Sequence, residues 1–308
     1  MFLENVQVAA TQVGILYIIV AVGVIADKLG VFSEATARKC TDLLFYIITP
    51  AVIIKSFLSI EFSAETGKSL LVAILCGFAI HVVGIGIVTP FFRKGDKDTN
   101  CIFKYGTVYG NAGYMALPLA NAVLGDEGVF FCSAVVMAFN MFNFTHGIIV
   151  MSDDTKFRPI KLLLNPGTLS VLIGAPLFLL SVNLPQMISV PIDYVASLNT
   201  PFAMLIFGTY LSHAQITSIF EDKRMYLVTL LKLFVLPAII MLLLKLCGLT
   251  GTLLTAMTIS ASAPSANNTV MFAAKYNRDA RLASNLVAAV SFISIITMPI
   301  LIAISQSL

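Results

Sequence analysis

Charged residues are scarce in this chain of 308 residues. They make up 11% of the sequence, against roughly 25% in soluble domains, while 58% of the residues are hydrophobic and the mean hydropathy is +0.93. Apolar stretches of about 20 residues, each long enough to cross a ~30 Å hydrocarbon core, recur from end to end. This composition excludes a soluble enzyme, a secreted disulfide scaffold and a nucleic-acid binder. It predicts an all-α protein that crosses the lipid bilayer many times.

Paired cysteines and metal-binding motifs are also missing. The five cysteines stand singly, at Cys40, Cys76, Cys101, Cys132 and Cys247, so we expect buried thiols rather than disulfides or metal ligands. The sequence has no G-x-x-x-x-G-K-[ST] run, no H-E-x-x-H, and no serine–histidine or paired-aspartate arrangement at membrane depth. We therefore expect neither an enzyme nor a bound cofactor or metal.

The apolar stretches predict ten transmembrane helices joined by short connections. Their predicted ranges are 8–26, 41–59, 69–92, 102–124, 128–150, 167–184, 195–214, 225–246, 252–274 and 282–305. A polar linker at 151–166 lies near the centre of the chain and divides it into two five-helix repeats, 1–150 and 167–308. Because five is an odd number, the second repeat is predicted to be inverted relative to the first.

Lysine and arginine are distributed unevenly between the loops. The loops after predicted spans 1, 3, 5, 7 and 9 hold most of the nineteen basic residues, whereas the opposite loops and both termini hold only Lys68. Basic loops stay on the cytoplasmic side. We therefore expect a multi-pass protein of the cytoplasmic membrane with both termini outside.

Two sequence features recur at one offset and support the internal repeat. Thr49-Pro50 of span 2 recurs as Thr200-Pro201 of span 7. The same offset places segment 111–118 of span 4 over segment 262–269 of span 9.

Spans 4 and 9 carry helix-breaking residues in their middle. Span 4 contains Gly110, Asn111, Gly113 and Pro118, and span 9 contains Pro264, Asn267, Asn268 and Thr269. Such residues free backbone amides and carbonyls, which in a membrane must face protein or a cavity. Interrupted helices at matching positions of two repeats indicate a binding site near the membrane midplane. Proline kinks without a site are the alternative.

The polarity of this predicted site follows from a missing charge. No carboxylate lies in the middle of a predicted span, where cation and proton sites usually have one. The remaining groups are the N-terminal ends of the restarted helices, which attract anions, and neutral side chains. The predicted ligand is an organic anion such as a carboxylate, and the predicted binding residues are Asn111, Gly113, Met115, Pro118, Pro264, Asn267, Asn268 and Thr269.

Other polar residues at membrane depth have two interpretations each. Asn140 and Asn143 of span 5 face the site from behind or join neighbouring helices by hydrogen bonds. His81 of span 3 is a packed neutral histidine or a proton-coupling group. Lys232 of span 8 attracts anions or extends to the membrane surface, as we expect for Lys55.

Two runs of the sequence resemble one known family. The run Asn111-Ala-Gly-Tyr-Met-Ala-Leu-Pro118-Leu, and the run Ala263-Pro264-Ser-Ala-Asn267 with Ala274-Lys275-Tyr276 downstream, resemble the two helix crossovers of the auxin efflux carrier family. The ten predicted spans and outside termini extend the resemblance over the whole chain. The short central loop and the Asn267-Asn268 pair differ from the plant exporters and favour a bacterial carrier of small organic acids.

The resemblance implies a fold similar to that of bile acid symporters, in which the interrupted helices 4 and 9 cross. It implies a scaffold domain of helices 1, 2, 6 and 7, which forms a homodimer interface, and a transport domain of helices 3–5 and 8–10. In that family the asparagine at the position of Asn111 contacts the substrate carboxylate. Pro118 and Pro264 match the crossover prolines.

Three functions remain open at this point. The first is a secondary carrier that moves a small organic anion by an elevator-like form of alternating access. The second is a Na⁺- or H⁺-coupled symporter of organic acids, and the third is a receptor that binds a carboxylate without transporting it. The expected partners are the anion, the lipid bilayer and a second copy of the chain, with no nucleic acid.

Overall fold

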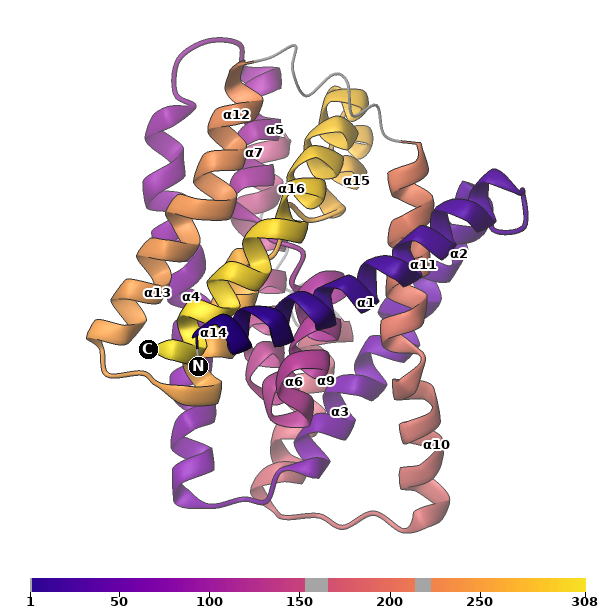
Figure 1. Cartoon of the computed structure of the whole chain (residues 1–308), viewed down its shortest axis with the longest axis vertical. Coiled ribbons are helices and arrows are strands. Elements are labelled where there is room, and N and C mark those ends of the chain that lie inside the picture. The colour runs from indigo at the N-terminus through magenta and orange to yellow at the C-terminus, as the bar shows by residue number, and fades with distance from the viewer. Residues whose placement is uncertain (1, 153–165, 214–222) are drawn as a thin grey trace.

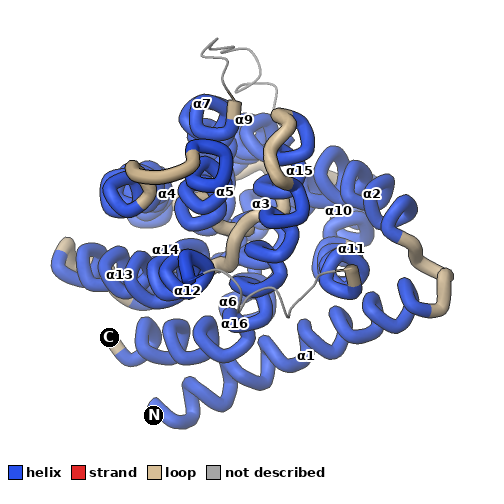
Figure 2. Tube along the Cα trace, turned by 90° about the horizontal axis from the view of Figure 1, so that it is seen from above, coloured by secondary structure: helices blue, strands red, loops and turns tan. Residues whose placement is uncertain are grey.

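The computed structural model describes residues 2–152, 166–213 and 223–308. All regular structure within these ranges is helical (Figures 1 and 2), and the one extended pairing there is a bridge between Gly110 and Ser265. The all-α prediction is confirmed for the described residues. The predicted linker, 151–166, lies almost entirely outside them.

The helices follow one another with few long connections (Figure 1). The first half of the chain forms α1 (Phe2–Lys28), α2 (Glu34–Leu43), α3 (Thr49–Ser59), α4 (Ala64–Phe91), α5 (Lys97–Val108), α6 (Leu117–Phe142) and α7 (Ile148–Met151). The second half forms α9 (Pro166–Leu179), α10 (Gln186–Ser197), α11 (Asn199–Ser212), α12 (Lys223–Leu230), α13 (Leu236–Leu246), α14 (Gly251–Ser262), α15 (Asn268–Lys275) and α16 (Ala280–Ser307). Four π-helical turns join or precede them, at Leu44–Ile48, Ala112–Ala116, Asn143–Gly147 and Leu231–Val235.

Seven helical stretches of the described chain are long and apolar enough to cross a membrane. They are Val6–Lys28, Glu34–Ser59, Ala64–Phe91, Ala112–Met151, Gln186–Ser212, Lys223–Leu246 and Ala280–Ser307. The apolar helix α9 is shorter, and a break separates α14 from α15. The stretch Ala112–Met151 combines half of predicted span 4 with span 5, and Gly125, at φ 67° and ψ −156°, divides it. These stretches agree with a protein that crosses the membrane several times.

Apolar side chains cover much of the outer surface of these helices. On α1, Ile18 is 67% exposed and Ile25 is 57% exposed; on α10, Met187 is 90% exposed. Contiguous apolar surface of this kind is unfavourable in water and marks a membrane or interaction surface. Together with the length of the helices, it indicates that lipid is the solvent of this face.

Three prolines each follow a π-helical turn. Pro50, Pro118 and Pro237 stand in the first turn of α3, α6 and α13, directly after such a turn. A proline lacks an N–H group and its ring clashes with the carbonyl four residues earlier. The wider π-helical turn accommodates both effects without ending the helix. In span 4 the helix therefore restarts at Ala112, before Pro118 is reached.

Close packing of α1 fixes its position against α11 and α16 (Figures 1 and 2). Gly23 of α1 faces Gly208 of α11. A Cβ atom built on Gly208 would stand 2.1 Å from the backbone oxygen of Val20, and one built on Gly23 would stand 2.4 Å from that of Leu205. Glycine at both positions lets the two backbones approach each other, as small residues do in membrane helix pairs.

Candidate functional site

The interruptions of the two broken helices bond directly to each other. The amide N–H of Asn111 donates to the carbonyl oxygen of Pro264 at 2.7 Å, and the N–H of Ala266 donates to the carbonyl oxygen of Tyr109 at 2.9 Å. The Ser265 hydroxyl adds a bond to the carbonyl oxygen of Gly106 at 2.6 Å. This antiparallel contact, which we call the crossing, satisfies backbone groups that cannot face lipid.

Local sequence explains why both helices stop at the crossing. Pro264 follows the end of α14 and has no N–H to continue it. Tyr109 takes an extended conformation after α5, at φ −90° and ψ 105°. A glycine is needed at position 110, where the two broken helices approach each other, because a Cβ on Gly110 would stand 3.1 Å from the backbone oxygen of Ala263.

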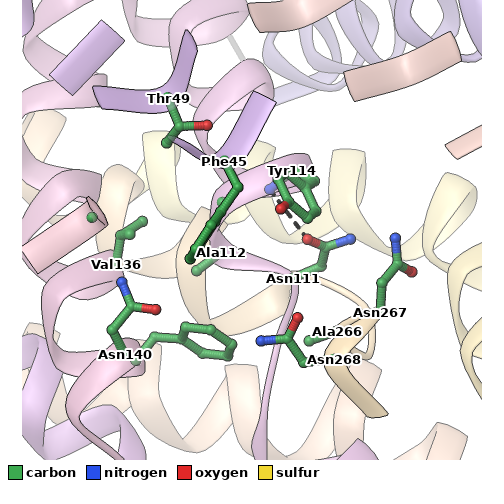
Figure 3. Close-up of a pocket in the computed structure, with 13 residues that line it drawn as sticks. Phe45, Thr49, Asn111, Ala112, Tyr114, Val136, Asn140, Ala266, Asn267 and Asn268 are labelled. Carbon is green, nitrogen blue, oxygen red and sulfur yellow. Dashed lines mark hydrogen bonds between the residues drawn. The ribbon is translucent and has the colours of Figure 1, made fainter. Parts of the chain in front are cut away.

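A cavity of about 40 Å³ lies beside the crossing. The two restarted helices supply Asn111, Ala112, Gly113 and Tyr114, and Ala266, Asn267 and Asn268. The rest of the wall comes from Phe45, Thr49, Val136, Phe139, Asn140 and Gly167. Figure 3 shows the asparagines and Tyr114 gathered around this space. None of these lining residues is charged.

Hydrogen-bond donors without partners surround the cavity. The side-chain oxygen of Asn111 accepts the Tyr114 N–H at 3.1 Å (Figure 3), which leaves the Asn111 Nδ2 group as a fixed donor. Asn111 and Asn140 are each 3% exposed, and neither Nδ2 atom has a partner among the described residues. The backbone N–H groups of Gly113, Asn267 and Asn268 likewise bond to no described residue. Helix N-termini with free N–H groups form ready anion sites.

The structure brings some of the predicted binding residues to the cavity and not others. Asn111, Gly113, Asn267 and Asn268 line it, and so does Asn140. Met115 and Pro118 are buried in the restarted helix outside the lining, Pro264 contributes its carbonyl to the crossing, and the Thr269 hydroxyl bonds to the carbonyl oxygen of Ala266 at 2.7 Å. These four residues do not line the cavity in this structure.

Asn143 and His81 lie away from the cavity. The side-chain oxygen of Asn143 accepts a short hydrogen bond from the Tyr105 hydroxyl. His81 Nδ1 lies 2.7 Å from the carbonyl oxygen of Gly77, and its ring stacks on Phe142 with centroids 5.2 Å apart. Neither side chain lines the cavity, and the Nδ2 group of Asn143 has no partner among the described residues.

Sequence reasoning missed the wall formed by Phe45, Tyr114 and Thr49. Phe45 and Tyr114 lie on apolar helical turns where nothing distinguishes them from lipid-facing aromatics. Thr49 did carry a signal, because it belongs to the repeated Thr-Pro pair, and its hydroxyl donates to the Asn199 side-chain oxygen at 3.4 Å.

A second, larger cavity of about 380 Å³ contains Lys55. Its ammonium group lies 3.8 Å from the carboxylate of Asp126. Lys55 thus pairs with a group that follows the Gly125 break in α6, and it is only partly exposed.

Within the described residues, no group of three or more His, Cys, Asp or Glu side chains could hold a metal ion.

Apolar helices, two interrupted helices that meet, and a donor-lined cavity at their junction together indicate a multi-pass membrane protein with an internal polar cavity. Comparison with known sequences gives the particular family. The profile of the family described as "Membrane transport protein" matches residues 8–158 and 153–302. The chain therefore belongs to this family of transporters, which is the auxin efflux carrier family, and the resemblance seen in the sequence is confirmed.

One relative is similar over most of its length. It is described as an uncharacterized transporter of Methanocaldococcus jannaschii, and it is 24% identical over 286 residues, which cover 87% of this chain and 89% of the relative.

Proposed function

We propose that this protein is a secondary carrier that moves a small organic anion with a carboxylate group, bound in the cavity at the crossing. The observation that supports this most strongly is the set of unpartnered donors around the cavity. Two buried carboxamide groups and the free N–H groups of two helix N-termini point to a ligand with several acceptor atoms. The lining contains no carboxylate, which would repel such a ligand.

The size of the cavity limits what fits without movement. One water molecule needs ~10–15 Å³ of such space, so about 40 Å³ holds a few water molecules at most. An acid larger than a few atoms therefore enters only when the walls move apart. Phe45 and Tyr114, which stand on different helices, are the side chains whose separation would widen the space.

The proposed mechanism is alternating access in a chain of ten crossings arranged as two inverted repeats. The scaffold comprises helices 1, 2, 6 and 7 of the predicted spans and forms a homodimer, and the elements that carry the crossing move against it in an elevator-like step. Both termini face outside the cytoplasmic membrane. Export of an anion runs downhill on an inside-negative potential, which contributes ~2.3 kcal/mol per charge per 100 mV.

The test uses purified protein in sealed liposomes with an imposed membrane potential. A panel of mono- and dicarboxylates is added with and without Na⁺, and charge movement is recorded. Asn111→Asp keeps an oxygen to accept the Tyr114 N–H but replaces the free donor with a negative charge. We expect at least about a tenfold loss of transport, because a hydrogen bond to a charged ligand is worth ~1.5–3 kcal/mol. Asn277→Asp makes the same change on the exposed loop between α15 and α16 and serves as the control.

Electroneutral exchange carries no current, so radiolabelled counterflow follows if no current is recorded. Transport of an acid that Asn111→Asp leaves unchanged would overturn the proposed site. Binding of an acid without counterflow would instead favour a receptor.

A further inference from the structure

Lys232 is buried beside the crossing and is not among the residues that line the cavity. It belongs to the π-helical turn between α12 and α13 and is 3% exposed. A Cβ built on Gly110 would stand 2.9 Å from Lys232 Nζ and 3.1 Å from the carbonyl oxygen of Ala263. The ammonium group thus lies against the backbone of Gly110, and the Ala263 carbonyl of the second broken helix adjoins the same point.

No described residue neutralises this lysine. The ion pairs of the described chain involve other basic groups. His81, the nearby titratable group, carries no negative charge. An unpaired ammonium in a low-dielectric interior is unfavourable, so its surroundings must supply negative charge by another route.

The ends of α5 and α14 supply that charge. α5 ends at Val108 and α14 ends at Ser262, directly before the crossing. The last carbonyl groups of a helix lack intrahelical partners, and each helix C-terminus acts as roughly −0.5 elementary charge. Two such ends converge beside Lys232, while the N-terminal ends of the restarted helices face the cavity. The crossing is therefore polarised, with Lys232 on its negative side.

In carriers with interrupted helices, freed carbonyls and helix C-termini are the groups that coordinate a coupling cation. A lysine ammonium is a compact charge with three donors, so it can serve the same carbonyls from within the chain. We infer that Lys232 is a built-in counter-charge that takes the place of a coupling cation at the crossing, so that transport requires no Na⁺. This inference rests on the proposed function and concerns the coupling of that same site.

Two other roles for Lys232 agree less well with its position. Direct binding of the anion requires the ammonium to reach the cavity, which it does not line. Extension to the membrane surface requires an exposed head group, whereas the residue is almost fully buried. Lys232 is therefore a positioning residue, since it acts on the ligand through the backbone of the crossing.

The first experiment measures thermal unfolding of the detergent-purified protein and does not depend on transport. The wild type, Lys232→Ala and Lys232→Met are compared in Na⁺, in Li⁺ and in N-methyl-D-glucamine, which is too large to enter. We expect the wild-type Tm to be the same in all three. Lys232→Ala leaves space beside the carbonyls, so its Tm is lowered and Na⁺ or Li⁺ raises it again, because a ligand that binds only the folded state stabilises it. Lys232→Met fills the space with an apolar chain, so its Tm is lowered without a response to cations.

Lys245→Ala is the matched control. Lys245 is a half-buried lysine at the other end of α13, where its ammonium donates to the carbonyl oxygen of Leu308, and its substitution should create no response to cations. A wild-type Tm that rises specifically with Na⁺, or a Lys232→Ala variant that ignores both cations, overturns the inference.

The second experiment measures counterflow of the acid found with the liposome panel. We expect wild-type rates to be equal in Na⁺ and in N-methyl-D-glucamine, and Lys232→Met to be about tenfold slower, the size of a buried charge–dipole contribution. Lys232→Arg retains the charge and restores most of the rate, which a loss of packing alone does not predict. Na⁺-dependent wild-type transport would overturn the inference but leave the carrier function intact. If the wild-type Tm and the Lys232→Ala Tm respond to cations as expected but no acid is transported, the inference about Lys232 stands and the proposed carrier function is overturned.

Discussion

The Nδ2 group of Asn140 is a buried donor that has no partner among the described residues. An unsatisfied buried donor costs ~1–3 kcal/mol, so an apolar side chain of similar shape should stabilise the fold while it removes a contact to the ligand. For Asn140→Leu we expect Tm to rise by about 2 °C and transport to fall about tenfold. Thermal unfolding and liposome transport, measured on the same preparation, check whether Tm rises and whether transport falls. A Tm that falls together with transport would assign Asn140 a structural role.

Gly110 and Gly113 differ in what surrounds them, although both lie in the interrupted part of span 4. A Cβ on Gly110 would meet the backbone oxygen of Ala263 and the Lys232 ammonium, whereas a Cβ on Gly113 would meet nothing within 4 Å. We expect Gly110→Ala to destabilise the protein by about 1–3 kcal/mol, as overpacking does, and Gly113→Ala to leave stability unchanged. Chemical or thermal unfolding in detergent distinguishes them. Equal losses would mean that the crossing is not packed as described.

Single residues also show where sequence reasoning succeeds. Asn111 and Asn267 could be predicted as cavity residues, because a polar amide beside a helix break has few other places to go in a membrane. Lys232 could not be assigned, since its approach to Gly110 depends on how α12 and α13 pack against the crossing. Met115 and Thr269 were predicted as binding residues from proximity in sequence alone, and both are buried in the restarted helices outside the lining of the cavity.

At the scale of an element, α5 depends on the loop residue that precedes it. Asp96 caps its N-terminus, with a carboxylate oxygen 2.8 Å from the Thr99 N–H. Hydrogen bonds from the Thr99 side chain and backbone lower the pKa of this carboxyl below its ordinary value. A lowered pKa in the folded state means that the carboxylate contributes stability above its unfolded pKa and loses it as the pH falls through the folded one.

We therefore expect Asp96→Ala to lower Tm at neutral pH, and Asp96→Asn to retain much of the cap, because asparagine also accepts at this position. The wild type should have a higher Tm than Asp96→Asn at neutral pH, and this difference in Tm should shrink on acidification below about pH 4. Thermal unfolding of the three proteins as a function of pH measures this. An advantage that grows in acid would contradict the assignment of the cap.

The broken helices show what an element's sequence can and cannot specify. Proline and glycine at membrane depth predicted both interruptions, and both are present. The restart of the first helix at Ala112 was not predicted, because nothing in the sequence marks a π-helical turn before Pro118. The mutual bonding of the two breaks, far apart in the chain, depends on the packing of the whole protein.

At the scale of the whole molecule, the contact of α1 with α11 joins the two ends of the predicted scaffold. A side chain on Gly208 would collide with the α1 backbone, whereas Gly14 of α1 has nothing within 4 Å of its Cβ position. We expect Gly208→Leu to cost more than about 4 kcal/mol, the range of exceptional single substitutions, and Gly14→Leu to be tolerated. The yield and size-exclusion profile of the detergent-extracted protein compare them. A monodisperse Gly208→Leu protein of normal Tm would show that the two helices pack elsewhere.

The broad architecture followed from the sequence because membrane depth limits the choices. An apolar stretch of sufficient length must be a helix, and the described chain is helical throughout its regular parts. Ten spans were predicted, and seven stretches of the described chain are long and apolar enough to be one. The difference arises because α9 is short and two predicted spans are interrupted. The number and the direction of the membrane crossings depend on where lipid surrounds the chain. The hydrophobic pattern of the sequence reflects that surrounding only indirectly.

The backbone contact between Tyr109 and Ala266 has a consequence for how this protein can change over evolutionary time. Main-chain atoms make that contact and the one from Asn111 to Pro264, so neither bond depends on the identity of a side chain. Side chains that line the cavity without belonging to the crossing, such as Phe45 and Asn268, can therefore vary without undoing the junction. Under the proposed function, a single substitution at either position can change which acid is preferred, while the backbone framework stays the same.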